Sequence, residues 1–344
     1  MKRVKSKINF SNFGKDCLSF RAFGINILLK EFKYIREIHM RDKGQNPLNR
    51  LFILFTILLF ITASCAHKEI QPPPISPLPP PKPAKIALVL GAGAAKGFAH
   101  IGVLKVLEAN KIPIHMIVGT SAGSFVGSLY AYGHNAFQLQ TLALSVEKGD
   151  IVDLIIPDNG FIQGVKLSEY INKVLKNTPL EKLNIPFYAV ATDIQNGQEV
   201  VFGQGNTGSA VRASCSVPGV FRPVKIGDRM YVDGGVVSPV AVDAALKYGA
   251  DVIVAVDISS DVGASKPEGT IETILQSVNI MYSRLGAIQC AKADVVIKPK
   301  VGHIGSSDFS KKHEAILEGE KAATEALPKV KGILDRLKKE GRLQ

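Results

Sequence analysis

The sequence has no tryptophan and only four cysteines among its 344 residues. The absence of tryptophan excludes no function. The cysteines form no Cys-x-x-Cys pair with histidines at zinc-ligand spacing, which argues against a structural zinc site. Their wide spacing equally argues against a disulfide framework, and nothing in the sequence requires a metal or a cofactor. The four cysteines are Cys17, Cys65, Cys215 and Cys290.

Excess positive charge is scarce outside the N-terminal region, although the formal net charge is +12. Residues 1–50 contribute +8 and residues 51–64 carry no charged side chain, which leaves +4 for residues 65–344. No basic stripe interleaved with aromatic residues is found there. The composition therefore excludes nucleic acid as the expected partner of the main part of the chain.

Residues 51–61 form an apolar run that follows Arg50. The run is shorter than the about 20 residues of a membrane-spanning helix and fits the core of a signal peptide; a buried helix is the alternative. It leads into Thr62-Ala63-Ser64-Cys65, which resembles a bacterial lipoprotein cleavage site with Cys65 as the lipidated residue, although Thr62 departs from the usual aliphatic residue. A start of translation at Met40 would give this signal peptide an ordinary length.

A proline-rich stretch over residues 72–83 predicts an extended, semi-rigid spacer. We therefore expect three parts: an N-terminal extension with a signal peptide (1–64), a linker (65–84) and one catalytic-size domain (85–344). The predicted product is an exported, membrane-anchored lipoprotein. Ala66 after the cysteine favours the outer over the inner membrane.

Apolar runs typical of strands alternate with helical patterns from residue 85 onward. This alternation predicts a three-layer α/β/α fold with a mostly parallel central sheet. The C-terminal stretch from Lys311, rich in Lys and Glu, is expected to form a solvated helix pair. The predicted strands are 85–90, 112–118, 187–193, 199–202, 230–232, 252–257 and 295–298; the predicted helices are 98–109, 122–132, 166–175, 241–248, 271–285 and much of 313–339.

The segment Gly119-Thr120-Ser121-Ala122-Gly123 lies between a predicted strand and a predicted helix. A serine at such a bend projects its hydroxyl from the fold, and Gly119 and Gly123 leave room for the bend. The N-terminus of the following helix favours developing negative charge beside the serine. An ordinary turn is the alternative, but the strand-turn-helix context favours Ser121 as a nucleophile.

A second glycine-rich loop, Gly91-Ala92-Gly93-Ala94-Ala95-Lys96-Gly97, follows the first predicted strand. Its glycine spacing departs from Gly-x-Gly-x-x-Gly, and the next strand ends without an acidic residue, so a dinucleotide site is disfavoured. Such a loop can instead point backbone N–H groups at an oxyanion. In a parallel sheet this loop and the serine bend would share the carboxyl edge.

The segment Asp233-Gly234-Gly235 follows a short predicted strand and supplies a candidate base for Ser121. The two glycines allow a sharp turn that leaves the carboxyl group accessible. Asp-Gly is also a common hairpin turn, which is the alternative.

Taken in order, these blocks resemble the bacterial patatin-like phospholipase family over about residues 85–300. The matching segments are 90–104, 119–123, 191–193, 213–224 and 232–235. The resemblance implies a lipid acyl hydrolase, phospholipase A-like or lysophospholipase-like, with a Ser121–Asp233 dyad, no histidine and an acyl-enzyme. It further implies an oxyanion hole from the backbone of Gly91, Ala92, Gly93 and Ala94, with Lys96, Gly119, Gly123, Gly234 and Gly235 in support. The expected partners are a lipid ester and, through Cys65, a membrane.

Two other functions stay open at this point. A Ser-His-Asp carboxylesterase of the α/β-hydrolase type would need His303 or His313, the only histidines after Asp233. A surface lipoprotein that binds lipid without turnover is the other, since motifs do not prove activity. The upstream His100 and His115 are expected to be structural.

Overall fold

The computed structural model describes residues 81–154, 160–259 and 267–343, together with positions 33 and 55. The described main part belongs to one compact unit, Pro79–Gln344. The predicted signal peptide, Cys65 and most of the proline-rich spacer lie outside the described residues. Within the described part, no helix combines the length and the apolar character that crossing a membrane requires.

The described residues contain an eight-stranded mixed sheet in the order β5-β6-β3-β2-β1-β7-β8, with β4 paired to β3. The strands β3, β2, β1, β7 and β8 run parallel, whereas β4, β5 and β6 join by antiparallel pairing. The strands are β1 (Ile86–Leu90), β2 (Met116–Thr120), β3 (Phe187–Asp193), β4 (Glu199–Phe202), β5 (Val224–Ile226), β6 (Arg229–Asp233), β7 (Val252–Val256) and β8 (Val295–Ile297).

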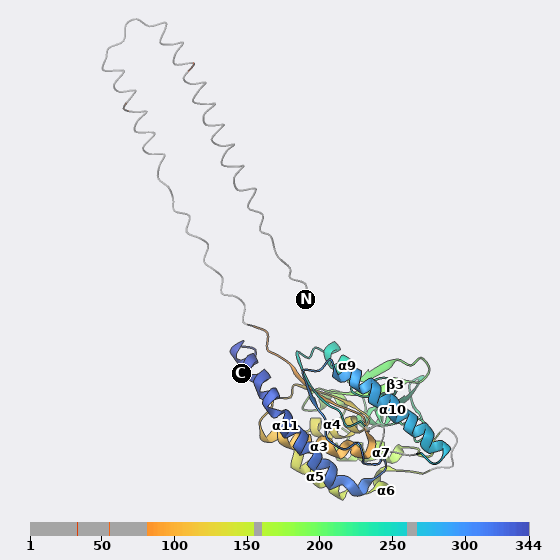
Figure 1. Cartoon of the computed structure of the whole chain (residues 1–344). Helices are drawn as coiled ribbons and strands as arrows, with labels where there is room; N and C mark the ends of the chain where they lie inside the picture. Colours follow the sequence, from red (N-terminus) through yellow and green to blue (C-terminus); the bar gives the residue numbers. More distant parts are fainter. Residues whose placement is uncertain (1–32, 34–54, 56–80, 155–159, 260–266, 344) are drawn as a thin grey trace, which may run out of the picture. The chain divides into compact units, whose positions relative to one another are not determined.

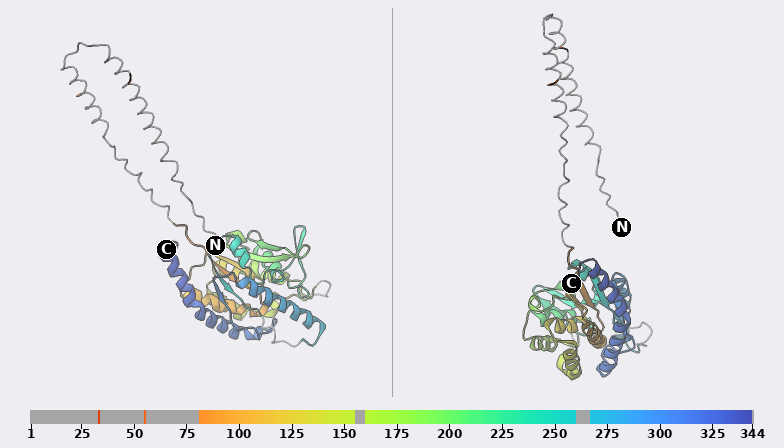
Figure 2. Two further views of the ribbon diagram at one scale, coloured as in Figure 1. Left: turned by 45° about the horizontal axis from the view of Figure 1, so that its top comes forward. Right: turned by 90° about the vertical axis from the view of Figure 1, so that its left-hand side faces the viewer.

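Side chains of β1 alternate between two hydrophobic cores, as a strand buried on both faces requires. Ile86, Leu88 and Leu90 face the larger core, which includes residues of α3, α4 and α11. Ala87 and Val89 face a smaller core with residues of α9 and α10. Helices therefore cover both faces of the sheet (Figures 1 and 2), and the predicted three-layer fold is confirmed. The helices are α3 (Phe98–Ala109), α4 (Ala122–Tyr132), α5 (Ala136–Ser145), α6 (Lys148–Ile151), α7 (Val165–Val174), α8 (Thr207–Ser214), α9 (Val242–Lys247), α10 (Thr270–Cys290) and α11 (Lys312–Lys339), with 3-10 turns η1 (Ala94–Gly97), η2 (Leu180–Lys182), η3 (Gly234–Val236) and η4 (Phe309–Lys311).

The pairing of β3 brings the ends of two other strands together. Ala191 pairs with both β4 and β6, so these two strands lie on opposite edges of β3. Val190 pairs with both β4 and β2, so β2 shares an edge of β3 with β6. β2 ends at Thr120, opposite Val190, and β6 ends at Asp233, opposite Ala191. The two strands thus meet end to end, and Ser121 follows at that junction.

Two sequence-based expectations about the elements were wrong in detail. The C-terminal stretch forms one helix, α11, that includes Pro328, rather than a helix pair. This helix is also not fully solvated, because residues such as Ile316, Ala323 and Val330 are buried in the larger core. The strand expected from residue 112 begins only at Met116, and the preceding His115 accepts a hydrogen bond from the Ile86 amide through Nδ1 at 3.1 Å.

Candidate active site

Ser121 occupies the bend between β2 and α4 in a strained backbone conformation. Its φ of 54° and ψ of −120° are unfavourable for a residue with a Cβ atom. Close packing requires glycine on both sides: a Cβ at Gly119 would lie 2.6 Å from the Gly123 carbonyl oxygen, and a Cβ at Gly123 would lie 2.0 Å from the Leu90 carbonyl oxygen. The predicted strand-turn-helix geometry around Ser121 is therefore present.

Hydrogen bonds hold the Ser121 backbone in this conformation. Its amide donates to Ser214 Oγ at 2.9 Å, and its carbonyl accepts from the amide and the hydroxyl of Ser124 at 2.8 and 2.7 Å. These bonds offset the cost of the strained φ. The residue keeps 5% of its surface exposed, so the hydroxyl lies at the edge of the interior.

Asp233 is fully buried, with 0% exposure. Its Oδ1 accepts from the Gly235 amide at 2.7 Å and from the Tyr282 hydroxyl at 3.5 Å. Oδ2 has no well-formed hydrogen bond to any described residue, and the neighbouring Ser121 hydroxyl interacts with this carboxyl group. Burial raises the pKa of Asp233 to about 7, against the lowering by the nearby Ser121 hydroxyl and by the hydrogen bonds from Gly235 and Tyr282. The carboxyl is therefore a stronger base than an exposed aspartate.

The two glycines after Asp233 permit close contacts on either side of it. A Cβ at Gly234 would lie 2.2 Å from the Val190 carbonyl oxygen of β3. A Cβ at Gly235 would lie 2.3 Å from the ring of Tyr282, so the tyrosine packs directly on this turn. Sequence reasoning did not single out Tyr282, which lies on α10 and outside every motif.

The loop after β1 divides the four predicted oxyanion-hole amides into two pairs. The amide of Gly91 donates to the Val256 carbonyl at 3.0 Å, and that of Ala92 donates to the Pro239 carbonyl at 2.8 Å. Within the described part of the chain, the amides of Gly93 and Ala94 donate to no protein acceptor. Gly91 and Ala92 thus fix the loop, and only Gly93 and Ala94 have N–H groups left to bind a ligand.

Two buried polar side chains follow in the same segment. His100 Nε2 is 2.9 Å from the Gly91 carbonyl oxygen, and burial lowers the pKa of His100 to about 4. The ring is therefore neutral near pH 7 and donates through Nε2, which supports the loop. Lys96 is buried as well, and its amide donates to the Gly93 carbonyl at 3.1 Å, closing the turn of η1.

Cys215 also lies beside Ser121, in the segment 213–224 that carries part of the family resemblance. Its Sγ is 3.7 Å from Ser124 Oγ. Its interaction with Ser121 acts to lower the pKa of the thiol. Burial and the nearby Asp233 raise the pKa of the Cys215 thiol to about 12. The thiol therefore stays protonated, and it is not itself a nucleophile near neutral pH.

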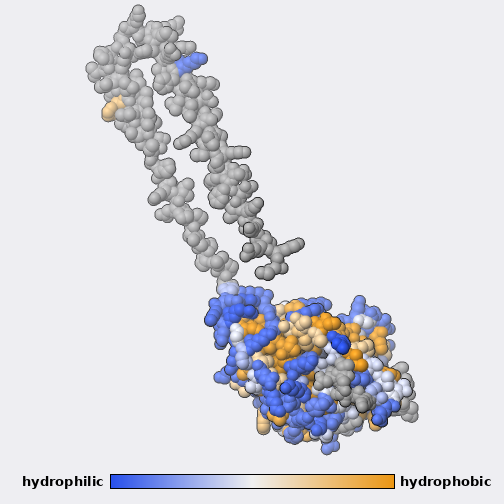
Figure 3. Space-filling view, in the orientation of Figure 1, coloured by the Kyte–Doolittle hydropathy of each residue, from blue (hydrophilic) through white to orange (hydrophobic). Residues whose placement is uncertain are grey.

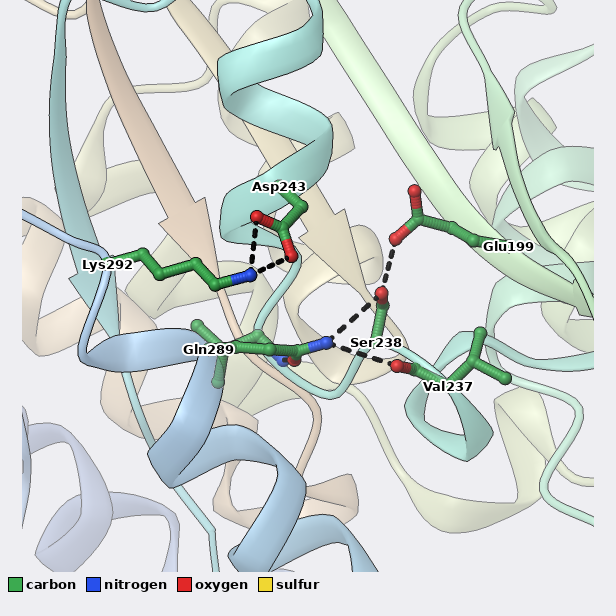
Figure 4. A network of polar contacts seen from close by, with 7 residues as sticks. Glu199, Val237, Ser238, Asp243, Gln289 and Lys292 are labelled. Atoms are coloured by element: carbon green, nitrogen blue, oxygen red, sulfur yellow. Dashed lines mark hydrogen bonds and ion pairs between the residues drawn. The ribbon is translucent and has the colours of Figure 1, made fainter.

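A polar network holds the segment after Asp233 to the rest of the site (Figure 4). Gln289 on α10 donates to the Val237 carbonyl at 3.1 Å and accepts from the Val240 amide at 3.0 Å. The Ser238 hydroxyl donates to Glu199, and the Ser238 carbonyl accepts from Thr120 Oγ1 at 2.9 Å. The network links α10 to the residue directly before Ser121.

The structure does not bring the downstream histidines to this site. His303 Nε2 lies 2.6 Å from Glu314 Oε1, in a pair of exposed side chains. His313 is the second residue of α11. A triad with either histidine thus lacks the required contact with Asp233 or Ser121 among the described hydrogen bonds.

No group of three or more His, Cys, Asp or Glu side chains that could hold a metal ion occurs within the described ranges. A cavity of about 330 Å³ is lined by residues that include Arg212, Lys225 and Met230, but not by Ser121 or Asp233. The chemistry available at the bend therefore comes from a hydroxyl, a buried carboxyl and backbone amides.

Residues 88–246 match the family model described as patatin-like phospholipase. Residues 88–246 are thus similar to patatin-like phospholipase domains. The crystal structure of VipD from Legionella pneumophila superimposes with a TM-score of 0.50 at 12% identity, covering 72% of this chain and 67% of that one. At this identity the likeness concerns the fold alone.

Several curated proteins are similar to this patatin-like domain. An uncharacterized NTE family protein of Mycobacterium tuberculosis is 33% identical over 186 residues, which cover 53% of this chain and 51% of the relative. The human patatin-like phospholipase domain-containing protein 6 is 35% identical over 184 residues, 51% of this chain and 13% of the relative. Lysophospholipase NTE1 of Coccidioides immitis is 31% identical over 293 residues, 75% of this chain and 18% of the relative. The alignment thus spans about half of the mycobacterial relative and a small part of the other two.

Proposed function

We propose that this protein is a lipid acyl hydrolase in which Ser121 is the nucleophile and Asp233 is the general base. One observation carries the proposal: a serine in a strained bend adjoins a buried carboxyl group whose pKa is raised to about 7. A base with a pKa near the working pH is the most effective proton acceptor for a weakly acidic hydroxyl. Among the described residues, no histidine hydrogen-bonds to either side chain of this pair, which favours direct proton transfer.

In the proposed reaction, Asp233 accepts the proton of the Ser121 hydroxyl while Oγ attacks the ester carbonyl carbon. The carbonyl oxygen becomes an oxyanion that accepts hydrogen bonds from the amides of Gly93 and Ala94. Collapse of this intermediate breaks the bond to the leaving alcohol, which takes the proton from Asp233. The products of this half-reaction are the free alcohol and an acyl group bound to Ser121.

Water completes the cycle on the same atoms. Asp233 accepts a proton from water, the resulting hydroxide equivalent attacks the acyl carbon, and the proton returns to Ser121 Oγ as the fatty acid leaves. The N-terminus of α4 directly follows Ser121, and its dipole favours the negative charge of both intermediates. The buried, neutral His100 acts at a distance by holding Gly91 in place.

The proposed substrates are carboxylic esters of lipids, either diacyl phospholipids or lysophospholipids. Two of the similar proteins are named as a lysophospholipase and as a patatin-like phospholipase domain-containing protein, which supports this class of substrate. The test is release of free fatty acid from a panel of phosphatidylcholine, lysophosphatidylcholine and monoacylglycerol by the purified full chain. Fatty acid release by the wild type and not by Ser121→Ala is expected; no release from any lipid ester would contradict the proposal.

Anchoring to a membrane through Cys65 is part of the proposed function and rests on the sequence alone. The segment Thr62-Ala63-Ser64-Cys65 supports it. Growth of a bacterial host with a labelled fatty acid, followed by isolation of the protein, tests the proposal. Label that persists in Cys65→Ser, or that is absent from the wild type, would contradict it.

A further inference from the structure

The outer side of α10 carries an exposed apolar stripe. Ile274, Met281 and Ile288 have 54, 59 and 63% of their surface exposed. They are spaced seven residues apart, which is about two helical turns, so they lie along one line of the helix. Figure 3 shows apolar residues gathered on the part of this face that α10 crosses in Figure 1.

The composition of α10 differs from that of an ordinary solvated helix. Among its 21 residues only Glu272 and Arg284 are charged. The 28-residue α11, also partly exposed, contains Lys, Arg, Glu and Asp along its whole length. An exposed apolar line on a helix with so few charges indicates a contact with another apolar surface.

The inner side of α10 contacts the candidate active site at two points. The Tyr282 hydroxyl is 3.5 Å from Asp233 Oδ1. Gln289 forms hydrogen bonds with the backbone of Val237 and Val240 at 3.1 and 3.0 Å. A helix with its side chains is about 10 Å across. A surface in contact with the apolar stripe would therefore lie within roughly one helix diameter of the proposed base.

We propose that the outer face of α10 docks on the surface of phospholipid aggregates and so brings the dyad to its substrate. The inference rests on the proposed function, because it takes the substrate to be a lipid. Burial of the three apolar side chains among acyl chains supplies the attraction. The exposed Arg284, on the same outer side, is placed to reach lipid phosphates.

A second copy of the chain fits this stripe less well. Two helices that pair through heptads need apolar residues at two positions of each repeat. Three residues after Ile274 and Met281 lie Ser277 and Arg284, which are polar and exposed, and four residues after them lie Val278 and Leu285, which are apolar but partly buried. The most exposed apolar surface is thus a single line that offers little to a helix-helix seam, whereas a lipid surface accepts a narrow apolar line with polar residues at its border.

The test compares two double variants of the full chain. Met281→Asp with Ile288→Asp places charge on the α10 stripe, and Phe137→Asp with Leu317→Asp places the same charge on exposed apolar residues of α5 and α11. Hydrolysis of vesicles of equal parts phosphatidylcholine and phosphatidylglycerol should fall roughly tenfold or more for the α10 pair only. Hydrolysis of monomeric p-nitrophenyl butyrate should be unchanged in both, which also shows that both fold.

Equal vesicle hydrolysis by the α10 variant and the wild type would overturn the docking surface while leaving the proposed function intact. Failure of the wild type on both substrates would instead overturn the proposed function. A direct readout uses the full-length Ser121→Ala variant with a photoactivatable phosphatidylcholine in the same vesicles. Adducts within Thr270–Cys290 are expected. Adducts confined to α11, or α10-to-α10 crosslinks with a dimer in sedimentation, would contradict the inference.

Discussion

Asp233 and Glu314 are two carboxylates with opposite surroundings. Asp233 is buried, and burial raises its pKa to about 7. Glu314 is exposed, and hydrogen bonds and charge from Lys311 and then His303 lower its pKa. The buried group holds a proton near neutral pH, while the exposed group is a weak base. By residue type alone, Glu314 and His303 look like two members of a triad, yet in the structure they form a hydrogen-bonded pair of exposed side chains.

The comparison teaches that proton affinity at this site comes from desolvation rather than from a histidine relay. A buried carboxyl group cannot easily stay charged, which in the proposed reaction favours transfer of the proton from the Ser121 hydroxyl to it. The exposed Glu314 carboxylate, hydrogen-bonded by Lys311, is stabilised in its charged form and gains nothing from such a transfer. Variants of the two carboxylates and of their neighbours, together with the pH dependence of activity and stability, test this difference.

Ser121→Ala should have the largest effect. Without the hydroxyl there is no acyl-enzyme, and hydrolysis of a p-nitrophenyl acyl ester should fall on the order of 10⁴-fold or more. Ser128→Ala is the matched control, since Ser128 is a buried serine on the same helix whose hydroxyl donates to the Phe125 carbonyl. Comparable loss in both variants would show damage to α4 instead of loss of a nucleophile.

Asp233→Asn should lower turnover on the order of 10³–10⁴-fold by analogy with disrupted triads. The amide keeps the shape of the side chain but cannot accept the Ser121 proton. Glu314→Gln, the same change at the exposed carboxyl, should leave turnover at the wild-type level. Steady-state kinetics of the two variants measure both effects. A larger loss of turnover in Glu314→Gln than in Asp233→Asn would contradict the assignment of Asp233 as the base.

The pH dependence should show an acid limb near pH 7. Asp233 must be ionised to act as a base, so turnover should fall about tenfold per pH unit below that value. A pH–rate profile of kcat/KM on a monomeric ester measures this limb. A limb near pH 4 would mean that the base is an exposed carboxylate.

Stability should change with pH in the opposite direction to activity. The folded state raises the pKa of Asp233 from 3.8 to about 7, so it binds the proton more tightly than the unfolded chain does. This contribution to stability is fully present below the unfolded value and is lost as the pH rises through about 7. The wild type should therefore lose on the order of 1 kcal/mol or more relative to Asp233→Asn between about pH 4 and pH 8. Parallel denaturant melts would contradict this.

Tyr282→Phe should have a smaller effect. The hydroxyl donates a long hydrogen bond to Asp233 that lowers the pKa of the carboxyl, so its loss should move the acid limb to higher pH. Turnover at neutral pH should fall less than about tenfold, because a 3.5 Å bond is weak. A purely structural role would lower the rate without moving the limb.

His303→Ala, and likewise His313→Ala, should have the smallest effect, with turnover unchanged. Each should retain the pH–rate profile of the wild type, because neither histidine contacts the dyad in the described contacts. Loss of turnover in either folded variant, with its circular dichroism unchanged, would favour a Ser-His-Asp mechanism.

Local patterns predicted the Ser121 bend well. A strand, a bend between glycines and a helix are all encoded in one short continuous segment, and the structure has them at Met116–Thr120 and Ala122–Tyr132. The layer arrangement followed from the alternation of apolar strands and helices. These features depend on short-range sequence, which a single chain reveals.

Long-range pairing explains what the sequence could not predict. That β6 runs antiparallel and ends opposite Ala191 depends on the partners of β3. That the amides of Gly91 and Ala92 are already bonded depends on Val256 and Pro239, far along the chain. Tyr282 reaches Asp233 from a helix with no motif, so only the folded chain shows it.

Labelling of the full chain with a fluorophosphonate, mapped by mass spectrometry, tests the central claim most directly. The account predicts one adduct, on Ser121, formed by the wild type and strongly slowed in Asp233→Asn but not in His303→Ala. An adduct on another serine, or labelling of Ser121 at the same rate without the Asp233 carboxylate, would contradict it.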